Sequence, residues 1–241
     1  MLNVIDISNW QKTMDLRRVS FDAVVIKATE GVSFVDPYCD KFVQQAISLG
    51  KPFGFYHFAR NNQPEDEAMF FWENCQNYVG VGIPVLDIED DRIPNWGEYA
   101  QRFIDKFHAI TGVYPMVYCS AANLQRFYGY AIVDTCGLWV AGYPLGYHAL
   151  TFGMVPDFPY DVSPWKFAAM WQFTSTGHLD GFAENVDLNV FYGDVTAWEL
   201  YANPDAKEGL TEPLPKVDPS DDNGRSWTFE NSRLKIDVTL K

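Results

Sequence analysis

Short, strongly apolar runs alternate with helical patterns along most of this chain, and this alternation constrains the fold more than any other feature. Eight runs have the length and composition of buried strands, at residues 2–6, 23–29, 52–58, 83–89, 115–120, 138–141, 169–173 and 186–191. Helical patterns follow the second to the fifth of these runs, at residues 37–49, 64–78, 96–111 and 121–127. Because the strands are too apolar to face water, they predict a parallel sheet covered by helices.

About eight strands within roughly 190 residues are compact enough to close into a barrel. We therefore expect an α/β fold, an irregular TIM-like β/α barrel with few helices after the fifth strand, plus a short C-terminal tail. A doubly wound open sheet is the rival architecture. The chain has no G-x-G-x-x-G motif after its first strand and no P-loop, which weakens the nucleotide-binding version of that rival.

The composition changes near residue 202, where we expect the barrel domain (1–202) to end. Residues 203–226 are rich in proline and acidic side chains and are interpreted as a linker. Residues 227–241 alternate apolar and polar side chains, which indicates a short β segment. Fifteen residues cannot form a domain alone. Three roles stay open for this tail: docking on the barrel, pairing with another chain in self-association, or remaining from a wall-binding module.

The formal net charge of −14 argues against nucleic acid as a partner, because phosphate binding needs a basic face. No run of 18 apolar residues predicts insertion into a membrane. Met1 is followed by no basic and apolar leader pattern, so we expect synthesis in the cytoplasm. The four cysteines are far apart and outside C-x-x-C pairs, which favours free, mostly buried thiols over disulfides or a zinc site. We expect neither a metal nor a cofactor.

Four acidic residues fall where a β/α barrel places its active site, at the C-terminal ends of strands. Asp6 ends the first predicted strand, Asp87 and Glu89 end the fourth, and Asp187 lies within the last. The first and last strands of a closed barrel are neighbours, and the fourth lies across the mouth. We therefore expect all four acids around one central cleft. Acids at strand ends also cap helices, and this alternative holds for any one of them alone.

The spacing of Asp87 and Glu89 carries more information than either residue alone. Residues i and i+2 of a strand point to the same side, about 6.5 Å apart. Two carboxylates that close raise one another's pKa, so that one stays protonated near neutral pH. A protonated acid beside an ionised partner is what hydrolysis of a glycosidic bond requires.

Three further side chains are candidates for contact with a substrate. Lys27 lies in an otherwise apolar strand and needs a partner, which a cleft carboxylate would provide; a surface lysine is the alternative. Tyr56 and His57 are adjacent and point to opposite sides of their strand, and Trp171 and Gln172 pose the same question. We expect Tyr56 and Trp171 to contact substrate, with core packing as the equal alternative. His108 and His148 are interpreted as structural or surface residues.

Several motifs resemble glycoside hydrolase family 25, in the order and at about the spacing of that family over residues 1–195. They are VIDISNWQ (4–11), VVIKATEG (24–31), GFYHF (54–58), PVLDIE (84–89), GVYPMVYCS (112–120), LWVAGY (138–143), MWQFT (170–174) and VDLNVF (186–191). The family comprises lysozymes, many of them phage endolysins, that cleave the β-1,4 bond after N-acetylmuramic acid in peptidoglycan. The resemblance implies an irregular β/α barrel with extra strands at the end.

The resemblance also implies roles for the four acids. Glu89 would be the general acid, and Asp87 would stabilise positive charge and orient the acetamido group of the substrate. Asp6 and Asp187 would complete the acidic cleft. Whether the acetamido group or a carboxylate is the nucleophile stays open.

We accordingly expect a muramidase that acts on peptidoglycan after release from the cytoplasm, in phage-induced lysis of the host. Two alternatives remain. One is a related barrel glycosidase, for example one that acts on chitin. The other is an inactive peptidoglycan-binding or phage structural module on the same barrel.

Overall fold

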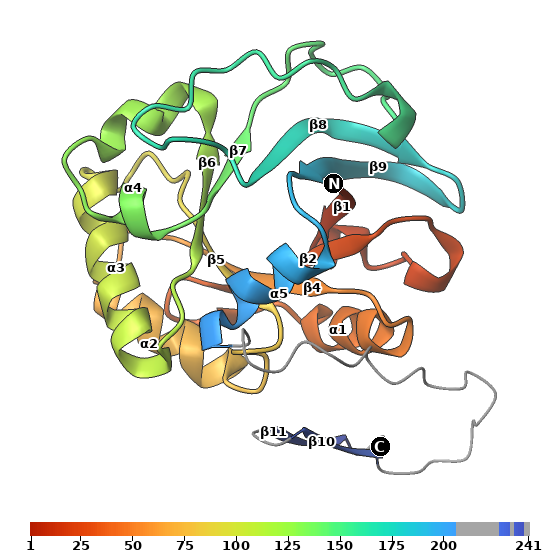
Figure 1. Ribbon diagram of the computed structural model, residues 1–241, viewed down its shortest axis with the longest axis horizontal. Coiled ribbons are helices and arrows are strands. Elements are labelled where there is room, and N and C mark those ends of the chain that lie inside the picture. Colours follow the sequence, from red (N-terminus) through yellow and green to blue (C-terminus); the bar gives the residue numbers. More distant parts are fainter. Residues whose placement is uncertain (206–226, 232–233, 239–241) are drawn as a thin grey trace.

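The computed structural model describes residues 1–205, 227–231 and 234–238. Eight strands form the barrel, in the order β1 (Leu2–Ile7), β9 (Phe182–Phe191), β8 (Met170–Leu179), β7 (Leu138–Ala141), β6 (Met116–Ser120), β5 (Ile83–Asp87), β4 (Phe53–Phe58) and β2 (Ala23–Glu30). β2 pairs with β1 and closes the ring, while the two-residue β3 (Phe34–Val35) pairs with β2 (Figure 1). The predicted barrel of about eight strands is confirmed.

The helices α1 (Cys39–Ser48), α2 (Pro64–Cys75) and α3 (Trp96–Thr111) follow β3, β4 and β5 within the ranges of the predicted helical patterns. Helix α3 begins at the capping side chain of Asn95 and ends at Gly112, whose φ of 74° suits glycine. The turn η3 (Ala121–Phe127) is a 3-10 helix, followed by the four-residue α4 (Ile132–Thr135). Between β7 and β8 only the three-residue η4 (Phe152–Met154) is helical, as the sparse helical pattern there predicted.

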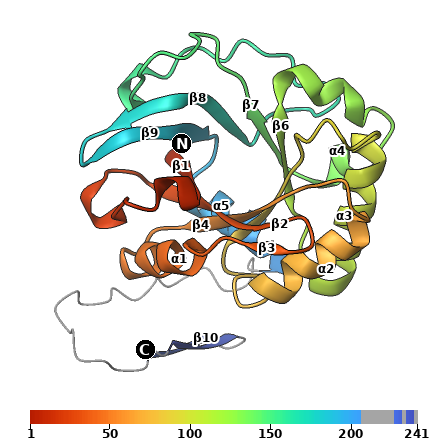
Figure 2. The same ribbon diagram turned by 180° about the vertical axis from the view of Figure 1, so that it is seen from behind.

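The last two barrel strands correct the expectation of a parallel sheet. β8 and β9 pair antiparallel, and β9 also runs antiparallel to β1. A turn at Asp180 and Gly181 joins them, too short for a crossover helix. The sequence did not predict this ribbon, because residues 174–185 are mostly polar, are a mixture of buried and exposed positions, and form no continuous apolar run. Figures 1 and 2 show the ribbon on the side of the barrel away from α2 and α3.

Apolar side chains form two layers, one inside the barrel and one between the strands and their helices. Helix α5 (Val195–Ala202), which sequence analysis did not predict, closes the barrel at the end where the parallel strands begin. Its Trp198 is 1% exposed, packs with the inner layer, and donates its indole N–H to the carbonyl of Phe53 at 3.1 Å. The opposite end, where those strands finish, is left for polar side chains.

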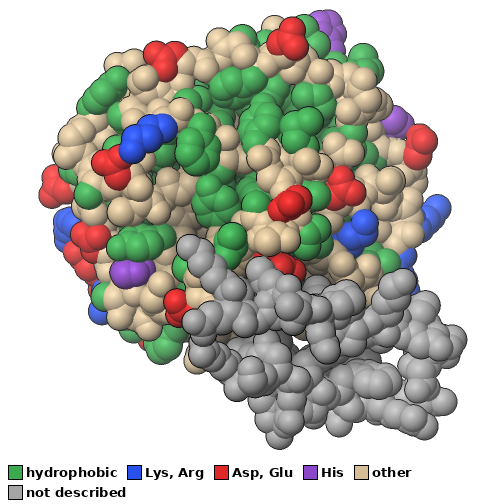
Figure 3. All heavy atoms as spheres, viewed as in Figure 1, with side chains coloured by type: hydrophobic (Ala, Val, Ile, Leu, Met, Phe, Trp, Pro, Cys, Tyr) green, Lys and Arg blue, Asp and Glu red, His purple; other side chains and the backbone are tan. Residues whose placement is uncertain are grey.

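Acidic and basic side chains are dispersed over the face of the molecule drawn in Figure 3. No helix in the described part of the chain is long and apolar enough to cross a membrane. The expected linker lies almost wholly outside the described residues. In the tail, β10 (Trp227–Asn231) and β11 (Leu234–Val238) pair antiparallel, so the single predicted β segment is two strands.

Candidate active site

All four predicted acids line one cavity of about 200 Å³ at the C-terminal ends of the parallel strands. Asp6 comes from β1, Asp87 from the last position of β5, Glu89 from the loop that follows, and Asp187 from β9. Their gathering contrasts with the dispersed charge in Figure 3. The remaining wall residues are Ser8, Trp10, Lys27, Tyr56, Phe58, Tyr118, Trp139 and Gln172.

Asp6 and Asp187 face each other directly in the register of the antiparallel pair β1–β9. Asp6 is 7% exposed, and burial raises its pKa, although hydrogen bonds from Asn189 and Gln172 oppose that effect. Burial, followed by the charge of Asp6, raises the pKa of Asp187 to about 9. Two carboxylates held this close do not both ionise at neutral pH. We infer that the pair holds a proton between them.

Asp87 lies deeper in the cavity than Glu89. It is 6% exposed, and burial raises its pKa well above the ordinary value, with the charge of Glu89 acting in the same direction. Its Oδ1 atom is buried and has no hydrogen-bond partner within the described residues. A buried carboxyl oxygen without a hydrogen-bond partner is uncommon in folded proteins, which distinguishes Asp87 from the other acids of the cavity.

Glu89 is exposed at the mouth of the cavity, yet protein atoms around its carboxyl exclude part of its water. This partial desolvation, aided by the charge of Asp6, raises the pKa of Glu89. Lys27 and Arg60 act in the opposite direction and lower it. Glu89 thus combines access to solvent and substrate with a proton held to higher pH than usual.

A polar chain from β6, β7, β8 and β9 orients two amides toward Asp6. The phenols of Tyr118 and Tyr143 both donate to Oε1 of Gln172, which turns its amide NH₂ toward Asp6 at 3.0 Å. The indole of Trp139 donates to Oδ1 of Asn189 at 2.8 Å, and the NH₂ of Asn189 donates to the same Oδ2 of Asp6 at 2.7 Å. The sequence pointed to Gln172 only as the alternative to Trp171, although a glutamine inside the apolar run AAMWQF is a usable signal, and it did not point to the other members of this chain.

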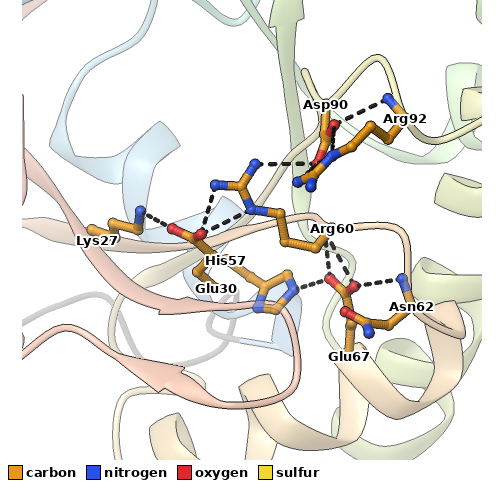
Figure 4. A network of polar contacts seen from close by, with 8 residues as sticks. All are labelled: Lys27, Glu30, His57, Arg60, Asn62, Glu67, Asp90 and Arg92. Carbon is orange, nitrogen blue, oxygen red and sulfur yellow. Dashed lines mark hydrogen bonds and ion pairs between the residues drawn. The ribbon is translucent and has the colours of Figure 1, made fainter.

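Lys27 lines the cavity, but its partner is not one of the four acids as we expected. Its ammonium group pairs with Oε2 of Glu30 at 2.6 Å, just outside the cavity. The other oxygen of Glu30 accepts two hydrogen bonds from Arg60, at 2.6 and 2.8 Å, and Arg60 also pairs with Asp90 at 3.1 Å (Figure 4). Asp90 in turn accepts from Arg92. Arg60 therefore connects the end of β2 to the loop that carries Glu89.

The backbone of Arg60 is fixed by the fully buried Glu67 of α2. Glu67 accepts from the amides of Arg60 and Asn62 at 2.9 and 3.2 Å, and contacts Nε2 of His57 at 2.7 Å (Figure 4). Burial lowers the pKa of His57, whose Nδ1 contacts the hydroxyl of Thr29 at 2.8 Å. His57 thus points away from the cavity and Tyr56 into it, so the two residues face opposite sides, as strand alternation predicted.

Trp171 does not line the cavity, so our expectation that it contacts substrate is wrong. Its side chain is fully buried, packs against Phe158 and Phe173, and donates its indole N–H to the carbonyl of Gly142 at 2.9 Å. The neighbouring Gln172 lines the cavity instead. Strand alternation requires one of these two residues to face the cavity. Gln172 does so, and the larger apolar ring of Trp171 packs in the core between strands and helices.

The described residues include no group of three or more His, Cys, Asp or Glu side chains that could hold a metal ion. All four cysteines are free and buried, as predicted. The carboxyl groups gathered at this site can transfer protons and stabilise developing charge.

Comparison with known proteins bears on this arrangement. The family model described as "Glycosyl hydrolases family 25" matches residues 5–182, which include Asp6, Asp87 and Glu89. The chain belongs to glycosyl hydrolase family 25. The match runs from β1 to the start of β9 and so covers the seven strands from β2 to β8 of this family 25 chain.

Two curated relatives and one solved structure illustrate the likeness. "Uncharacterized protein YegX" of Escherichia coli (strain K12) is 28% identical over 215 residues, covering 83% of this chain and 72% of the relative. "N,O-diacetylmuramidase" of Chalaropsis sp is 28% identical over 213 residues, covering 79% of this chain and 93% of the relative. The structure of a bacterial lysozyme from Streptomyces coelicolor has a TM-score of 0.71 at 23% identity, covering 84% of this chain and 97% of that one. At that identity it shows the shared fold.

Proposed function

We propose that this family 25 chain is a muramidase that hydrolyses the β-1,4 bond between N-acetylmuramic acid and N-acetylglucosamine in bacterial peptidoglycan. The observation that carries the proposal is the cavity that gathers Asp6, Asp87, Glu89 and Asp187 at the barrel mouth. Membership of the family and the likeness to a diacetylmuramidase support this choice of substrate.

Glu89 is the proposed general acid. A proton donor must reach the leaving oxygen and must be protonated at the working pH. Exposure at the cavity mouth gives Glu89 access to the leaving oxygen, and a pKa raised by partial burial and by Asp6 favours its protonated form. In hydrolysis the Glu89 carboxyl gives its proton to the glycosidic oxygen as the bond to the anomeric carbon breaks, and positive charge develops on the sugar ring. A water molecule completes the reaction by adding its hydroxyl to the anomeric carbon, and its remaining proton returns to a carboxylate of the cavity.

Asp87 is the proposed partner below the sugar ring. Its carboxyl lines the cavity, where it would orient the acetamido group, and in its ionised form it would stabilise the oxocarbenium-like transition state. Asp6 and Asp187, which share a proton, would hold the substrate and keep the cavity from carrying four charges at once.

The test is digestion of purified peptidoglycan by wild type and Glu89→Gln, followed by borohydride reduction and mass spectrometry of the products. Wild type should create reduced muramic-acid ends, and Glu89→Gln should create them about 10²–10⁴-fold more slowly while remaining folded. Reduced glucosamine ends would mean that another bond is cleaved. A folded wild type that creates no new ends would contradict the proposal and favour an inactive binding module.

We further propose that the enzyme acts in phage-induced lysis, released to the wall after synthesis in the cytoplasm. This part rests on the sequence resemblance to endolysins. It predicts that cytoplasmic expression in a bacterium lyses cells only when a membrane-permeabilising protein is co-expressed. Lysis without that protein would contradict it.

A further inference from the structure

Trp10 is the side chain on the cavity wall that neither the fold nor the four acids explain. It is 80% exposed, yet it borders the acidic cavity. The other tryptophans whose side chains the structure describes are half-buried or buried, five of them at 5% exposure or less: Trp96, Trp139, Trp165, Trp171 and Trp198. A large apolar ring exposed to water contributes little to the stability of the fold, so its position at the cavity mouth indicates a role in binding.

The turn that carries Trp10 is held firmly. It forms the 3-10 helix η1 (Asn9–Gln11), which begins at a capping box between Ser8 and Gln11. The buried Asp36 accepts a hydrogen bond from the amide of Asn9 at 2.8 Å. Further along, the hydroxyl of Thr13 donates to Glu184 of β9 at 3.1 Å. The exposed indole therefore projects from a fixed backbone, and little order has to be gained when it binds a ligand.

We propose that Trp10 is a stacking platform for a pyranose ring of the glycan strand, on the β1 side of the four-acid centre. The inference rests on the proposed function, because it assigns a sugar-binding position within the same substrate cleft. An indole offers a wide, rigid apolar face that matches the C–H face of a sugar ring, and its binding costs little side-chain entropy. Trp10 is the exposed aromatic side chain among those that line the cavity, since Tyr56 and Phe58 are half-buried and Tyr118 and Trp139 are buried.

The charge of the cavity narrows the class of ligand. Four carboxyl groups and the single ammonium of Lys27 line it, so an anionic group is disfavoured there. A neutral N-acetylglucosamine ring suits the site, whereas N-acetylmuramic acid carries a lactyl carboxylate once its peptide is removed. An amino group of the peptide stem, attracted by the acids and by the indole face, is the competing occupant. Peptide-free glycan chains separate the two.

The kinetic test compares wild type, Trp10→Ala and Trp10→Phe on soluble glycan chains from which an amidase has removed the peptides. Trp10→Ala should raise KM about 3- to 10-fold with kcat within about twofold of wild type, and Trp10→Phe should recover most of the loss. Phe167→Ala is the matched control, because Phe167 is 65% exposed but lies outside the cavity. An unchanged KM for Trp10→Ala, or an effect seen only on peptide-bearing chains, would overturn the platform.

A binding test keeps this inference separate from the enzymatic proposal. In the Glu89→Gln background, which should not consume the ligand, the same peptide-free glycan should protect Trp10 from fluorescence quenching by iodide. Adding Trp10→Ala to that background should weaken binding by a similar factor, and adding Phe167→Ala should not. If the wild type showed no hydrolytic activity but Trp10→Ala still weakened binding, the platform would be supported and the muramidase refuted. Equal binding by both double variants would refute the platform, whatever the activity.

Discussion

Replacing Glu67 by leucine should destabilise the barrel at a point that no sequence motif marks. Glu67 is fully buried and partners three groups: the amides of Arg60 and Asn62 and the imidazole of His57. A buried donor left without a partner costs about 1–3 kcal/mol. The two loop amides regain water more easily and are assigned about 1 kcal/mol each, whereas fully buried His57 is assigned about 2 kcal/mol. Removing a desolvated carboxylate returns about 1–2 kcal/mol, so the net loss is about 2–3 kcal/mol.

Urea unfolding followed by circular dichroism measures this loss. With a slope of about 3 kcal/mol per molar urea, the midpoint should fall by about 0.7–1 M. Glu73→Leu is the matched control, because Glu73 lies on the same helix with its side chain exposed, and it should change stability by less than about 0.5 kcal/mol. A Glu67→Leu protein as stable as the control would refute the reasoning that these hydrogen bonds hold the loop behind Glu89.

Three further predictions concern the cavity. Asp187→Asn should stabilise the protein at pH 8 and leave its melting temperature unchanged at pH 4. The pKa of Asp187 is raised to about 9, so between about pH 4 and pH 9 the unfolded chain releases a proton that the folded one keeps, and the folded state loses stability as pH rises through this range. Linkage over about four pKa units sets an upper bound of about 5 kcal/mol on the gain at pH 8. An equal effect of the substitution at both pH values would count against this reasoning. Arg60→Met should move the alkaline limb of kcat/KM to higher pH, because Arg60 lowers the pKa of Glu89; a profile that only falls in height would mean a purely structural role. Gln172→Leu should reduce kcat at least about tenfold without unfolding the protein, since it removes a donor to Asp6 and the shared acceptor of Tyr118 and Tyr143; near-normal turnover would exclude a positioning role.

The barrel and its acids were predictable because their signals are local. Parallel strands buried on both faces leave continuous apolar runs, and acids directly after such runs are conspicuous. Asp6, Asp87 and Glu89 were found in this way, and the cavity brings all three together with Asp187. The assignment of their chemical roles stays a prediction.

The β8–β9 ribbon was not predictable from the same signals. Its outer half leaves the helix-covered part of the barrel, so its residues are partly solvated and show no apolar run. The Lys27–Glu30–Arg60–Asp90 network was missed for a different reason. Lys27 and Glu30 lie on β2, whereas Arg60 follows β4 and Asp90 follows β5, so only the pairing of these three strands brings the network together.

The choice between Trp171 and Gln172 shows what strand alternation leaves undetermined. Alternation states that adjacent residues face opposite sides, and it does not state which side is the cleft. The register with β9 decides it, since Gln172 is paired with Asn189, and both amides reach Asp6. A polar residue in an apolar strand is the better candidate for the cavity, because burying its amide among the helix-side rings would leave it without partners.

Under the proposed function, the uneven placement of charge around the cavity distinguishes its two central carboxyls. Asp87 is buried and Glu89 is exposed, so only Glu89 can deliver a proton to a glycosidic oxygen at the mouth. Lys27 opposes the rise of pKa at both residues, whereas Arg60 acts on Glu89. An acid must be protonated before bond cleavage and must release its proton during it, and a pKa raised by burial but restrained by cations suits both demands. Glu67 fixes the backbone of Arg60, and Arg60 lowers the pKa of Glu89. The same network of polar contacts therefore stabilises the barrel and influences the protonation of Glu89.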